Sequence, residues 1–300
     1  GEFSERAFIN DKMDLAQAEA VADLIDATSI EAARSAVRSM QGEFSALITH
    51  LVEDMIQTRI YVEAAIDFPE EEIDFLKDAS LLARLDKLTN DLSSVLSKAQ
   101  QGSLLRDGLT LVLAGKPNSG KSSLLNALAG NDVAIVTPVA GTTRDVLRER
   151  IILEGLPLNI IDTAGLRDTD NQIEQEGVKR AWREIESADQ VLFLVDSTEE
   201  KLPDLKSVWP EFFERYPESK QRLTLLLNKI DISGIPAGAV AGQQNVFGIS
   251  AKEQTGFDGL ASHLKESAGF FGDSGGLFSA RRRHLTSLEK ALELVTIGVD

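Results

Sequence analysis

Cysteine is absent from the 300 residues of this sequence, which excludes disulfide frameworks, thiolate metal sites and cysteine nucleophiles. No apolar run approaches the ~18 residues that a membrane-spanning helix needs; the longest are short segments such as LTLVLA and VLFLV. No secretory signal peptide is visible either, because the chain opens with the charged stretch GEFSERAFINDKMD. We therefore expect a cytoplasmic protein that makes no membrane contact.

Positive charge is scarce. The chain has 31 Lys and Arg residues against 48 Asp and Glu residues, which gives a formal net charge of −17. A protein this acidic has no general attraction to nucleic acid or anionic lipid, so such a contact would need a local patch. The hydrophobic share of 43% is typical of a globular protein with a core. Because the chain starts at Gly1 and stops at Asp300 within a helical pattern, we expect a fragment of a longer protein.

Glycine and proline are rare in the first third of the chain. Only Gly1, Gly42 and Pro69 occur there, whereas the other 20 of 22 glycines lie at Gly102 or later. Both residues interrupt helices and strands, so the first third should consist of long helices. One helix is expected around 15–27, and a longer one of roughly 30 residues should follow it. Its apolar stripe consists of Val37, Met40, Phe44, Leu47, Ile48, Leu51 and Met55.

A third helix should follow the break at 67–69 and stop near Gly102, with Leu81, Leu85 and Leu88 on its apolar face. Stripes at this spacing favour a bundle that packs against itself, although a partner interface has the same pattern. The acidic run Glu70–Glu72 has two interpretations, a metal site or a solvated helix start, and the second is more common.

From Leu109 onward, short apolar strands alternate with helical stretches. The expected strands are LTLVLA, IILEG, LPLNIID, QVLFLVD, RLTLLLN and NVFGIS, and helices are expected near 121–129, 175–187, 205–215 and 257–267. Such alternation predicts a mainly parallel α/β sheet with covered faces.

A turn-rich linker at 269–276 precedes a return to helical spacing, which predicts an α/β domain inserted into an all-α helical domain. The expected boundaries are 1–105 for the first helical part, 106–272 for the inserted domain and 273–300 for the truncated helical return. The basic run at 281–283 could contact RNA, but three arginines that open a helix more often form a solvated face.

The segment Gly115–Ser122 reads GKPNSGKS, which fits G-x-x-x-x-G-K-S between an expected strand and an expected helix. Backbone N–H groups of such a loop, at the positive end of a helix, bind phosphate chains. Lys121 would neutralise β- and γ-phosphate oxygens, and the Ser122 hydroxyl would bind Mg²⁺. The nucleotide-binding residues expected in this segment are Asn118, Ser119, Gly120, Lys121, Ser122 and Ser123.

Three downstream motifs at strand ends favour GTP over ATP. Asp162–Gly165 reads DTAG, where Asp162 can hold Mg²⁺ through water and the Gly165 N–H can contact the γ-phosphate. Asn228–Asp231 reads NKID. The Asp231 carboxylate accepts from guanine N1–H and N2–H₂, donors that adenine does not present. The Lys229 stem can cover the base, and Asn228 can brace the loops.

The third motif, Ser250-Ala251-Lys252, places the Ala251 N–H where it can contact guanine O6. The segment 141–145 reads GTTRD, and a threonine there can contact both Mg²⁺ and the γ-phosphate and so order the loop in the triphosphate state. We assign this role to Thr143 rather than to Thr142.

Taken together, the chain resembles the MnmE (TrmE) family of tRNA uridine-modification GTPases, within the TrmE-Era-EngA-like superfamily. The resemblance covers essentially all 300 residues through GEFSERAFIN, DLAQAEAVADLIDA, YVEAAIDFPEEEIDF, GKPNSGKSSLLNALAG, VAGTTRDVLRE, IIDTAGLRDT and ARRRHL. It implies a G domain within a helical domain, GTP hydrolysis and potassium-dependent homodimerisation through G domains. It also implies an FAD-binding partner, MnmG (GidA), with which the family modifies C5 of the wobble uridine of tRNA.

Two family features have no counterpart in this sequence: an N-terminal folate-binding domain that also mediates dimerisation, and a Cys-containing C-terminal tail. A ribosome-assembly GTPase of the same superfamily is the alternative enzyme, and a binding switch without hydrolysis is the alternative from another class. Such ribosome-assembly proteins append an RNA-binding domain, whereas this chain has acidic helices on both sides.

The residue after the DTAG motif is Leu166, where Ras-type enzymes have a water-orienting Gln. By resemblance, the catalytic role passes to Glu174, which could otherwise be a plain helix-start carboxylate. The resemblance also makes Asn118 a potassium ligand, with a loop-stabilising Asn as the alternative. Potassium would then supply the charge of an arginine finger; Arg144 acting in cis is the weaker option. No histidine is implicated.

Overall fold

The computed structural model describes residues 1–67, 79–131, 148–162, 172–199, 205–217, 219, 222–270 and 276–298. The chain forms two compact units. The helical unit consists of Gly1–Asp107 together with Gly272–Asp300, and the α/β unit consists of Gly108–Phe271. The acidic run at 70–72 lies outside the described residues, so neither of its two interpretations is tested.

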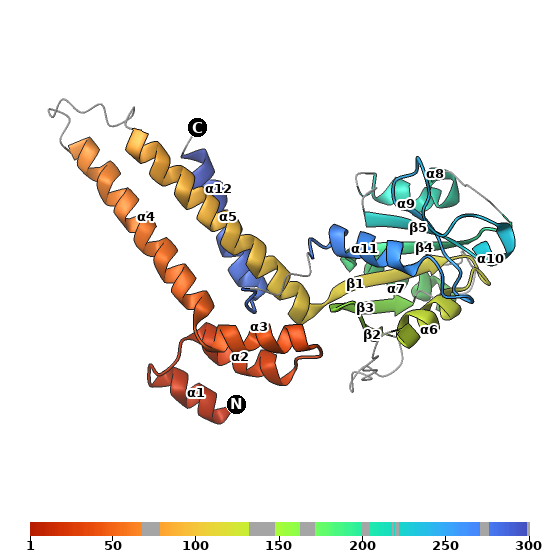
Figure 1. Cartoon of the computed structure of the whole chain (residues 1–300), viewed down its shortest axis with the longest axis horizontal. Coiled ribbons are helices and arrows are strands. Elements are labelled where there is room, and N and C mark those ends of the chain that lie inside the picture. Colours follow the sequence, from red (N-terminus) through yellow and green to blue (C-terminus); the bar gives the residue numbers. More distant parts are fainter. Residues whose placement is uncertain are drawn as a thin grey trace. The chain divides into compact units, whose positions relative to one another are not determined.

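The helical unit consists, in the described residues, of successive helices from the start of the chain together with one helix from its end (Figure 1). They are α1 (Glu2–Ile9), α2 (Leu15–Ile25), α3 (Ile30–Met40), α4 (Glu43–Asp67), α5 (Ala79–Asp107) and α12 (Arg282–Ile297). A capping box between Asp14 and Gln17 starts α2, and the Ser29 hydroxyl caps α3. None of the described helices combines the length and apolar character that crossing a membrane would require.

The single helix of roughly 30 residues expected around Val37–Met55 is wrong. The structure has two helices instead, because α3 ends at Met40 and α4 begins at Glu43. Gly42 takes a left-handed conformation with φ of 86°, which few other residues adopt readily, and the Gln17 amide donates to the Met40 carbonyl at 3.2 Å. The apolar spacing continues across the break because both helices contribute to one core.

That core joins the two ends of the chain. Its buried members are Phe44, Leu51, Leu88, Leu92, Val95, Ala99, Phe278, Ala280 and Leu288. The expected stop near Gly102 is also wrong, since α5 continues to Asp107. Gly102 has another role: a Cβ built there would lie 1.8 Å from the main-chain oxygen of Phe278. Only glycine therefore allows the returning segment to lie against α5.

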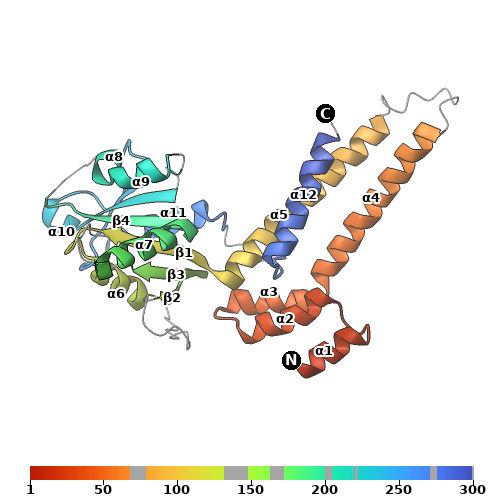
Figure 2. The ribbon, with the colours of Figure 1, turned by 180° about the vertical axis from the view of Figure 1, so that it is seen from behind.

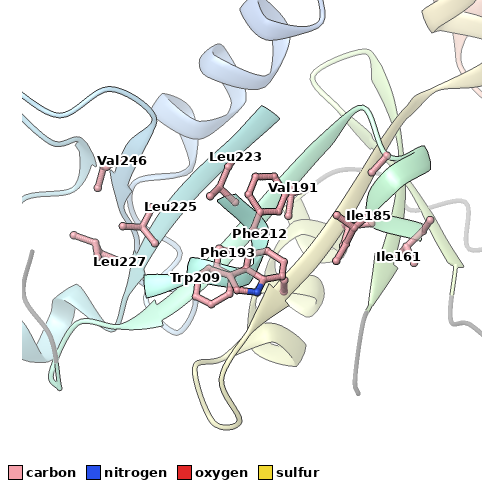
Figure 3. Packing of buried hydrophobic residues seen from close by; sticks show 13 residues of the cluster. Ile161, Ile185, Val191, Phe193, Trp209, Phe212, Leu223, Leu225, Leu227 and Val246 are labelled. Carbon is pink, nitrogen blue, oxygen red and sulfur yellow. The ribbon is translucent and has the colours of Figure 1, made fainter. Parts of the chain in front are cut away.

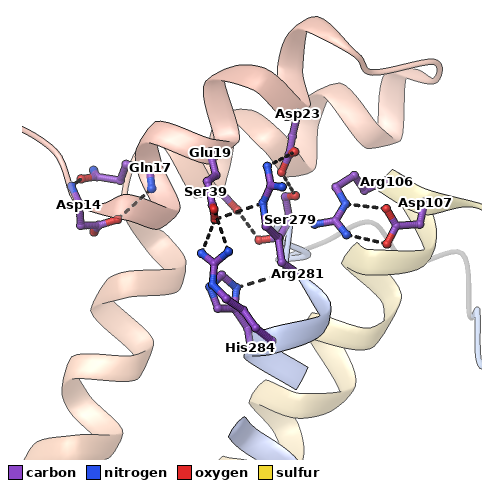
Figure 4. Close-up of polar contacts among 11 residues, drawn as sticks. Asp14, Gln17, Glu19, Asp23, Ser39, Arg106, Asp107, Ser279, Arg281 and His284 are labelled. Atoms are coloured by element: carbon purple, nitrogen blue, oxygen red, sulfur yellow. Dashed lines mark hydrogen bonds and ion pairs between the residues drawn. The ribbon is translucent and has the colours of Figure 1, made fainter. Parts of the chain in front are cut away.

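Polar contacts fasten the same returning segment (Figure 4). Arg283 donates to both oxygens of Glu19 at 2.8 and 2.6 Å, and Arg281 contacts Glu19 and Asp23, each at 3.1 Å. The Ser279 hydroxyl donates to Asp23. Two of the three arginines of the basic run thus form ion pairs within the helical unit rather than a purely solvated face.

The α/β unit is built on a seven-stranded sheet in the order β2-β3-β1-β4-β5-β7-β6. Figure 2 labels β1 to β4 of this sheet. Its strands are β1 (Leu109–Gly115), β2 (Arg148–Leu153), β3 (Leu156–Asp162), β4 (Gln190–Asp196), β5 (Leu223–Asn228), β6 (Gly238–Ala239) and β7 (Val246–Gly248). Strands β3, β1, β4, β5 and β7 run parallel, whereas β2 and β6 are antiparallel at the edges. The carboxyl ends of the parallel strands therefore meet at one edge, as expected for a mainly parallel α/β fold.

Helices cover the sheet: α6 (Lys121–Asn131), α7 (Gln172–Ser187), α8 (Leu205–Val208), α9 (Pro210–Arg215), α10 (Ile230–Ser233) and α11 (Phe257–Ser267). The stretch expected to be one helix over 205–215 is two, because Pro210 starts α9 after a break at Trp209. Arg222 donates to the carbonyls of Ile185, Glu186 and Ala188 and so caps the carboxyl end of α7.

Alternate residues of the strands pack on opposite faces of the sheet. One face forms an apolar cluster with residues of α7 and α9 (Figure 3). It includes Trp209, the two phenylalanine rings that contact Trp209, and the odd-numbered leucines of β5. The labelled members are Ile161, Ile185, Val191, Phe193, Trp209, Phe212, Leu223, Leu225, Leu227 and Val246. Thr224, between two of these leucines, faces the other side of the sheet, where its Oγ1 lies 2.9 Å from Nε2 of His263 in α11. Both faces of the sheet are therefore covered.

Candidate nucleotide-binding site

The loop 115–122 connects β1 to α6 at the edge where the parallel strands end. Gly115 and Gly120 have φ of 142° and 100°, and Asn118 has φ of 62°. A Cβ at position 115 would lie 2.4 Å from the Leu194 carbonyl oxygen of β4, so this glycine allows the loop to lie close to the sheet. The loop leads into the amino end of an 11-residue helix, where main-chain N–H groups and the helix dipole favour an anion.

The Lys121 ammonium donates to the carbonyls of Gly115 and Lys116 at 2.8 and 3.0 Å. Its charge is thereby fixed beside the loop. Asn118, Ser122 and Ser123 are exposed, and the side chain of Ser119 is buried. The loop therefore presents one held cation, an exposed amide and two exposed hydroxyls near the start of α6.

Asp162 ends β3 and lies opposite Leu113 of β1 in the parallel register. Its Oδ1 is buried and, among the described residues, has no hydrogen-bond partner. Burial raises the pKa of this carboxyl, and the nearby Lys121 charge opposes that effect only in part. A buried acceptor without a donor is a site that a cation would complete.

The donor set around Asp162 fits Mg²⁺. Carboxylate and hydroxyl oxygens are the ligands that this ion prefers, and it usually keeps water and phosphate oxygens for its other positions. The described residues contain no group of three or more His, Asp or Glu side chains that could hold a metal by themselves. Asp162 and Ser122 would thus supply only part of the coordination, as in a site shared with a phosphate ligand.

Asn228 connects three loops. It ends β5 and is buried, with 3% of its surface exposed. Its Nδ2 donates to the Ser119 carbonyl at 2.8 Å, and its Oδ1 accepts from the Ala251 N–H at 3.1 Å. Gly120 makes room for it, because a Cβ there would lie 2.1 Å from Nδ2. The side chain that the sequence suggests as a brace does lie between these loops.

Asp231 lies in α10 with its side chain exposed. Its Oδ1 accepts from the Ser250 hydroxyl at 2.7 Å, and that hydroxyl accepts in turn from the Glu253 N–H at 3.1 Å. The carboxylate is thus oriented by a buried serine and remains accessible to a ligand. Lys252, two residues after Ser250, is exposed and pairs with Glu253 at 3.3 Å.

One residue of this site is missing from the sequence-based set. Asp196 ends β4, and its carboxylate binds the Lys229 ammonium. Together with Lys116, Ser119 and Glu199, it lines part of a pocket of about 250 Å³ beside the loop 115–122. The only signal in the sequence is an acidic residue at the end of the expected strand QVLFLVD. The structure adds that this strand, β4, pairs with β5, the strand before NKID.

Several predicted residues cannot be placed. Thr143, Arg144 and Gly165 lie outside the described residues. The main chain of Glu174 lies in the first turn of α7, but its side chain is not described. The switch and catalytic roles therefore remain predictions.

The chain matches the family model for the MnmE helical domain over residues 15–299. It is 58% identical over 299 residues to the tRNA modification GTPase MnmE of Pseudoalteromonas atlantica, covering 99% of this chain and 65% of that protein. It is 56% identical to the same-named protein of Photobacterium profundum, covering 100% of this chain and 66% of that protein. The chain thus spans about two thirds of the length of these curated relatives. A crystal structure of an Aquifex aeolicus Era variant with GDP and AlF₄⁻ is 29% identical over 53% of this chain and 56% of that chain, with a TM-score of 0.41.

Proposed function

Because this chain belongs to the MnmE family, we propose that it is the GTP-binding and GTP-hydrolysing part of a tRNA-modifying enzyme. The observation that carries the proposal is the junction at Asn228, which ties the loop 115–122 to the loop that begins at Ser250. The exposed, oriented carboxylate of Asp231 lies on the same strand-end edge. This combination suits a ligand that has both a phosphate chain and a base with two adjacent N–H donors.

In this proposal the G domain extends over 106–272, and different residues of it bind the phosphates, the guanine base and the metal ion. The N–H groups of 118–123 and the Lys121 ammonium bind the phosphates, while Asp231, Lys229 and Ala251 bind guanine. Ser122, Asp162 and Thr143 hold Mg²⁺, which supplies positive charge at the phosphate oxygens. The Gly165 N–H contacts the γ-phosphate. Ser250 orients Asp231, and Lys252 belongs to the same loop as Ala251, next to the base.

For hydrolysis, we assign Glu174 to the attacking water and the exposed Asn118 amide oxygen to K⁺. Potassium-stimulated dimerisation of G domains, modification of C5 of the wobble uridine of tRNA, the flavoprotein partner MnmG and a cytoplasmic location belong to the same proposal. The relatives named as tRNA modification GTPases support the tRNA-modification part of this proposal.

The test of guanine binding is Asp231→Asn. We expect weaker GTP binding and a gain for xanthosine triphosphate, whose base has an acceptor where guanine has a donor. Asp258→Asn is the control, because Asp258 is an exposed aspartate of the same unit in α11. Titration of both variants with both nucleotides measures the effect. Unchanged GTP affinity in Asp231→Asn would contradict the proposal.

The test of hydrolysis is Glu174→Ala. Positioned acid–base groups contribute about 10²- to 10⁴-fold, so phosphate release in potassium should fall within that range while GTP binding persists. Sodium at equal ionic strength should support a much lower rate in the wild type. A fall below about tenfold would leave Glu174 as a helix-start residue. Absence of hydrolysis by the wild type in potassium would favour a pure binding switch.

A further inference from the structure

The segment 196–198 holds the end of β5 from the neighbouring strand. Asp196 and Asn228 lie opposite each other in the parallel register of β4 and β5. The Ser197 N–H and hydroxyl both donate to the Asn228 carbonyl, at 3.0 and 2.6 Å. The Ser197 hydroxyl also lies 2.7 Å from that of Ser233, at the end of α10. Residues before and after Asp231 are thus hydrogen-bonded to Ser197, which directly follows β4.

The Asp196 carboxylate is itself held in place. Its Oδ1 accepts from the N–H and the hydroxyl of Thr198 at 3.0 and 2.6 Å, and its Oδ2 binds the Lys229 ammonium. The side chain is 14% exposed. Burial alone would raise its pKa, but the bonds from Lys229 and Thr198 outweigh burial and hold the pKa below its usual value. Asp196 is therefore an anion at neutral pH, with a fixed direction.

Both ends of Lys229 are consequently fixed. Its main chain adopts a left-handed conformation with φ of 67°, which is uncommon for a residue with a side chain. The Ile230 N–H donates to the Ile249 carbonyl at 3.3 Å and anchors the main chain next to it. Between this anchor and the ammonium, the methylene stem has lost most of the rotamer freedom that a surface lysine keeps.

We propose that Asp196 is a positioning residue for guanine nucleotides: by holding the Lys229 ammonium, it fixes the methylene stem as a platform for the purine ring beside the Asp231 carboxylate. This inference rests on the proposed function. A fixed stem costs the ligand less ordering entropy than a free one, and immobilising such a side chain corresponds to a factor of about ten in affinity. Asp196 thereby tightens binding without touching the nucleotide.

The experiment compares Asp196→Asn with the wild type, using GDP labelled on its ribose with N-methylanthraniloyl. We expect about tenfold weaker binding, mainly through faster dissociation. Tripolyphosphate, which has no base, should compete with equal affinity in both proteins. In a Lys229→Ala background, Asp196→Asn should have no further effect. Asp189→Asn is the matched control, since Asp189 precedes β4 at its opposite end and accepts from the Thr110 N–H at 2.8 Å.

The outcomes separate this inference from the proposed function. If the wild type bound labelled GDP no better than labelled ADP, the proposed function would fail. If guanine preference held but Asp196→Asn bound GDP like the wild type, the inference would be wrong. Equal losses for GDP and tripolyphosphate would also overturn it, because they would show a general distortion of the loop 115–122. An additional loss in the Lys229→Ala background would show that Asp196 does not act through the lysine.

Discussion

Each of the two units is stabilised internally by a different kind of contact. In the α/β unit, the loops of the candidate site follow neighbouring strand ends and are joined by main-chain groups and one buried amide, Asn228. In the helical unit, segments about 250 residues apart are joined by apolar packing and by ion pairs between α2 and the start of α12. The first arrangement orients groups for a ligand, and the second closes a chain that has been interrupted.

In each unit, a glycine with no room for a side chain lies against the residue that joins the distant segments. Gly120 lies against Asn228, and Gly102 lies against Phe278. If the comparison is right, the same chemical change at these two positions should damage different properties. Both tryptophans, Trp182 and Trp209, belong to the α/β unit. Tryptophan fluorescence therefore reports the unfolding of that unit alone.

The largest effect is expected for Gly120→Ala. The added Cβ meets Asn228 and the φ of 100° disfavours a side chain, so Asn228 should lose its bonds to both loops. Loss of two hydrogen bonds predicts about 100-fold weaker GDP binding, measured by titration with the labelled nucleotide. Gly130→Ala is the control, since a Cβ at Gly130 meets nothing within 4 Å. Equal affinity in the two variants would break the comparison.

Gly102→Ala should act on the other unit. A Cβ that would lie 1.8 Å from the Phe278 oxygen forces the returning segment away from α5. Overpacking of this kind costs about 1–3 kcal/mol, and we expect the upper end because the obstacle is main chain. Hydrogen exchange at 277–280 should rise and the helical transition in circular dichroism should shift to lower temperature. Tryptophan fluorescence and GDP affinity should not change; a loss of affinity would show that the units do not separate in this way.

Arg283→Ala should remove about 1 kcal/mol from the helical unit, because it breaks a bidentate pair with the mostly buried Glu19. Burial raises the pKa of Glu19, but the Arg283 hydrogen bond and the Arg281 and Arg283 charges outweigh it and lower the pKa. The wild type should therefore lose this stabilisation as the pH falls through the lowered pKa, and the two proteins should converge in acid. Exposed Arg282→Ala is the control, with a change within about 0.5 kcal/mol.

The smallest effect concerns His263 in the α/β unit. Burial lowers its pKa, and the Glu266 charge opposes this only in part. The unfolded chain then takes up the proton first, so stability falls as the pH drops below about 6.5. His263→Gln should flatten the pH dependence of the tryptophan transition, whose slope from one proton is at most about 1.4 kcal/mol per pH unit. The exposed His50→Gln in the helical unit should leave that slope intact.

Most of the sheet could be predicted because β1, β3, β4 and β5 are apolar runs of six or seven residues separated by turn signals. The two-residue edge strand β6 was not expected, because Gly238–Ala239 is too short to form such a run. The candidate site residues at strand ends follow from motifs whose order along the chain matches the order of the proposed phosphate, metal and base contacts. Asp196 could not be found in this way, because a lone acidic residue after a strand is common and only the pairing of β4 with β5 brings it to Lys229.

The helical unit could be predicted less completely from the sequence. Apolar spacing identifies a buried face but not a break in the helix, so the turn at Gly42 was hidden within a continuous stripe. The pairing of Arg283 with Glu19 joins two segments that are separated in the sequence by the whole α/β unit. No local pattern encodes such a contact.

The close approach of Phe278 to Gly102 has a consequence for the order of folding. To the helical unit, the ~160 residues of the α/β unit are one loop, and the entropy cost of closing a loop rises only with the logarithm of its length. An insertion of this size is therefore tolerable in equilibrium terms, but a search through so long an unfolded loop is slow. Prior collapse of the inserted residues shortens that search. The helical unit should therefore fold faster when the contact between Phe278 and Gly102 forms after the α/β unit has collapsed.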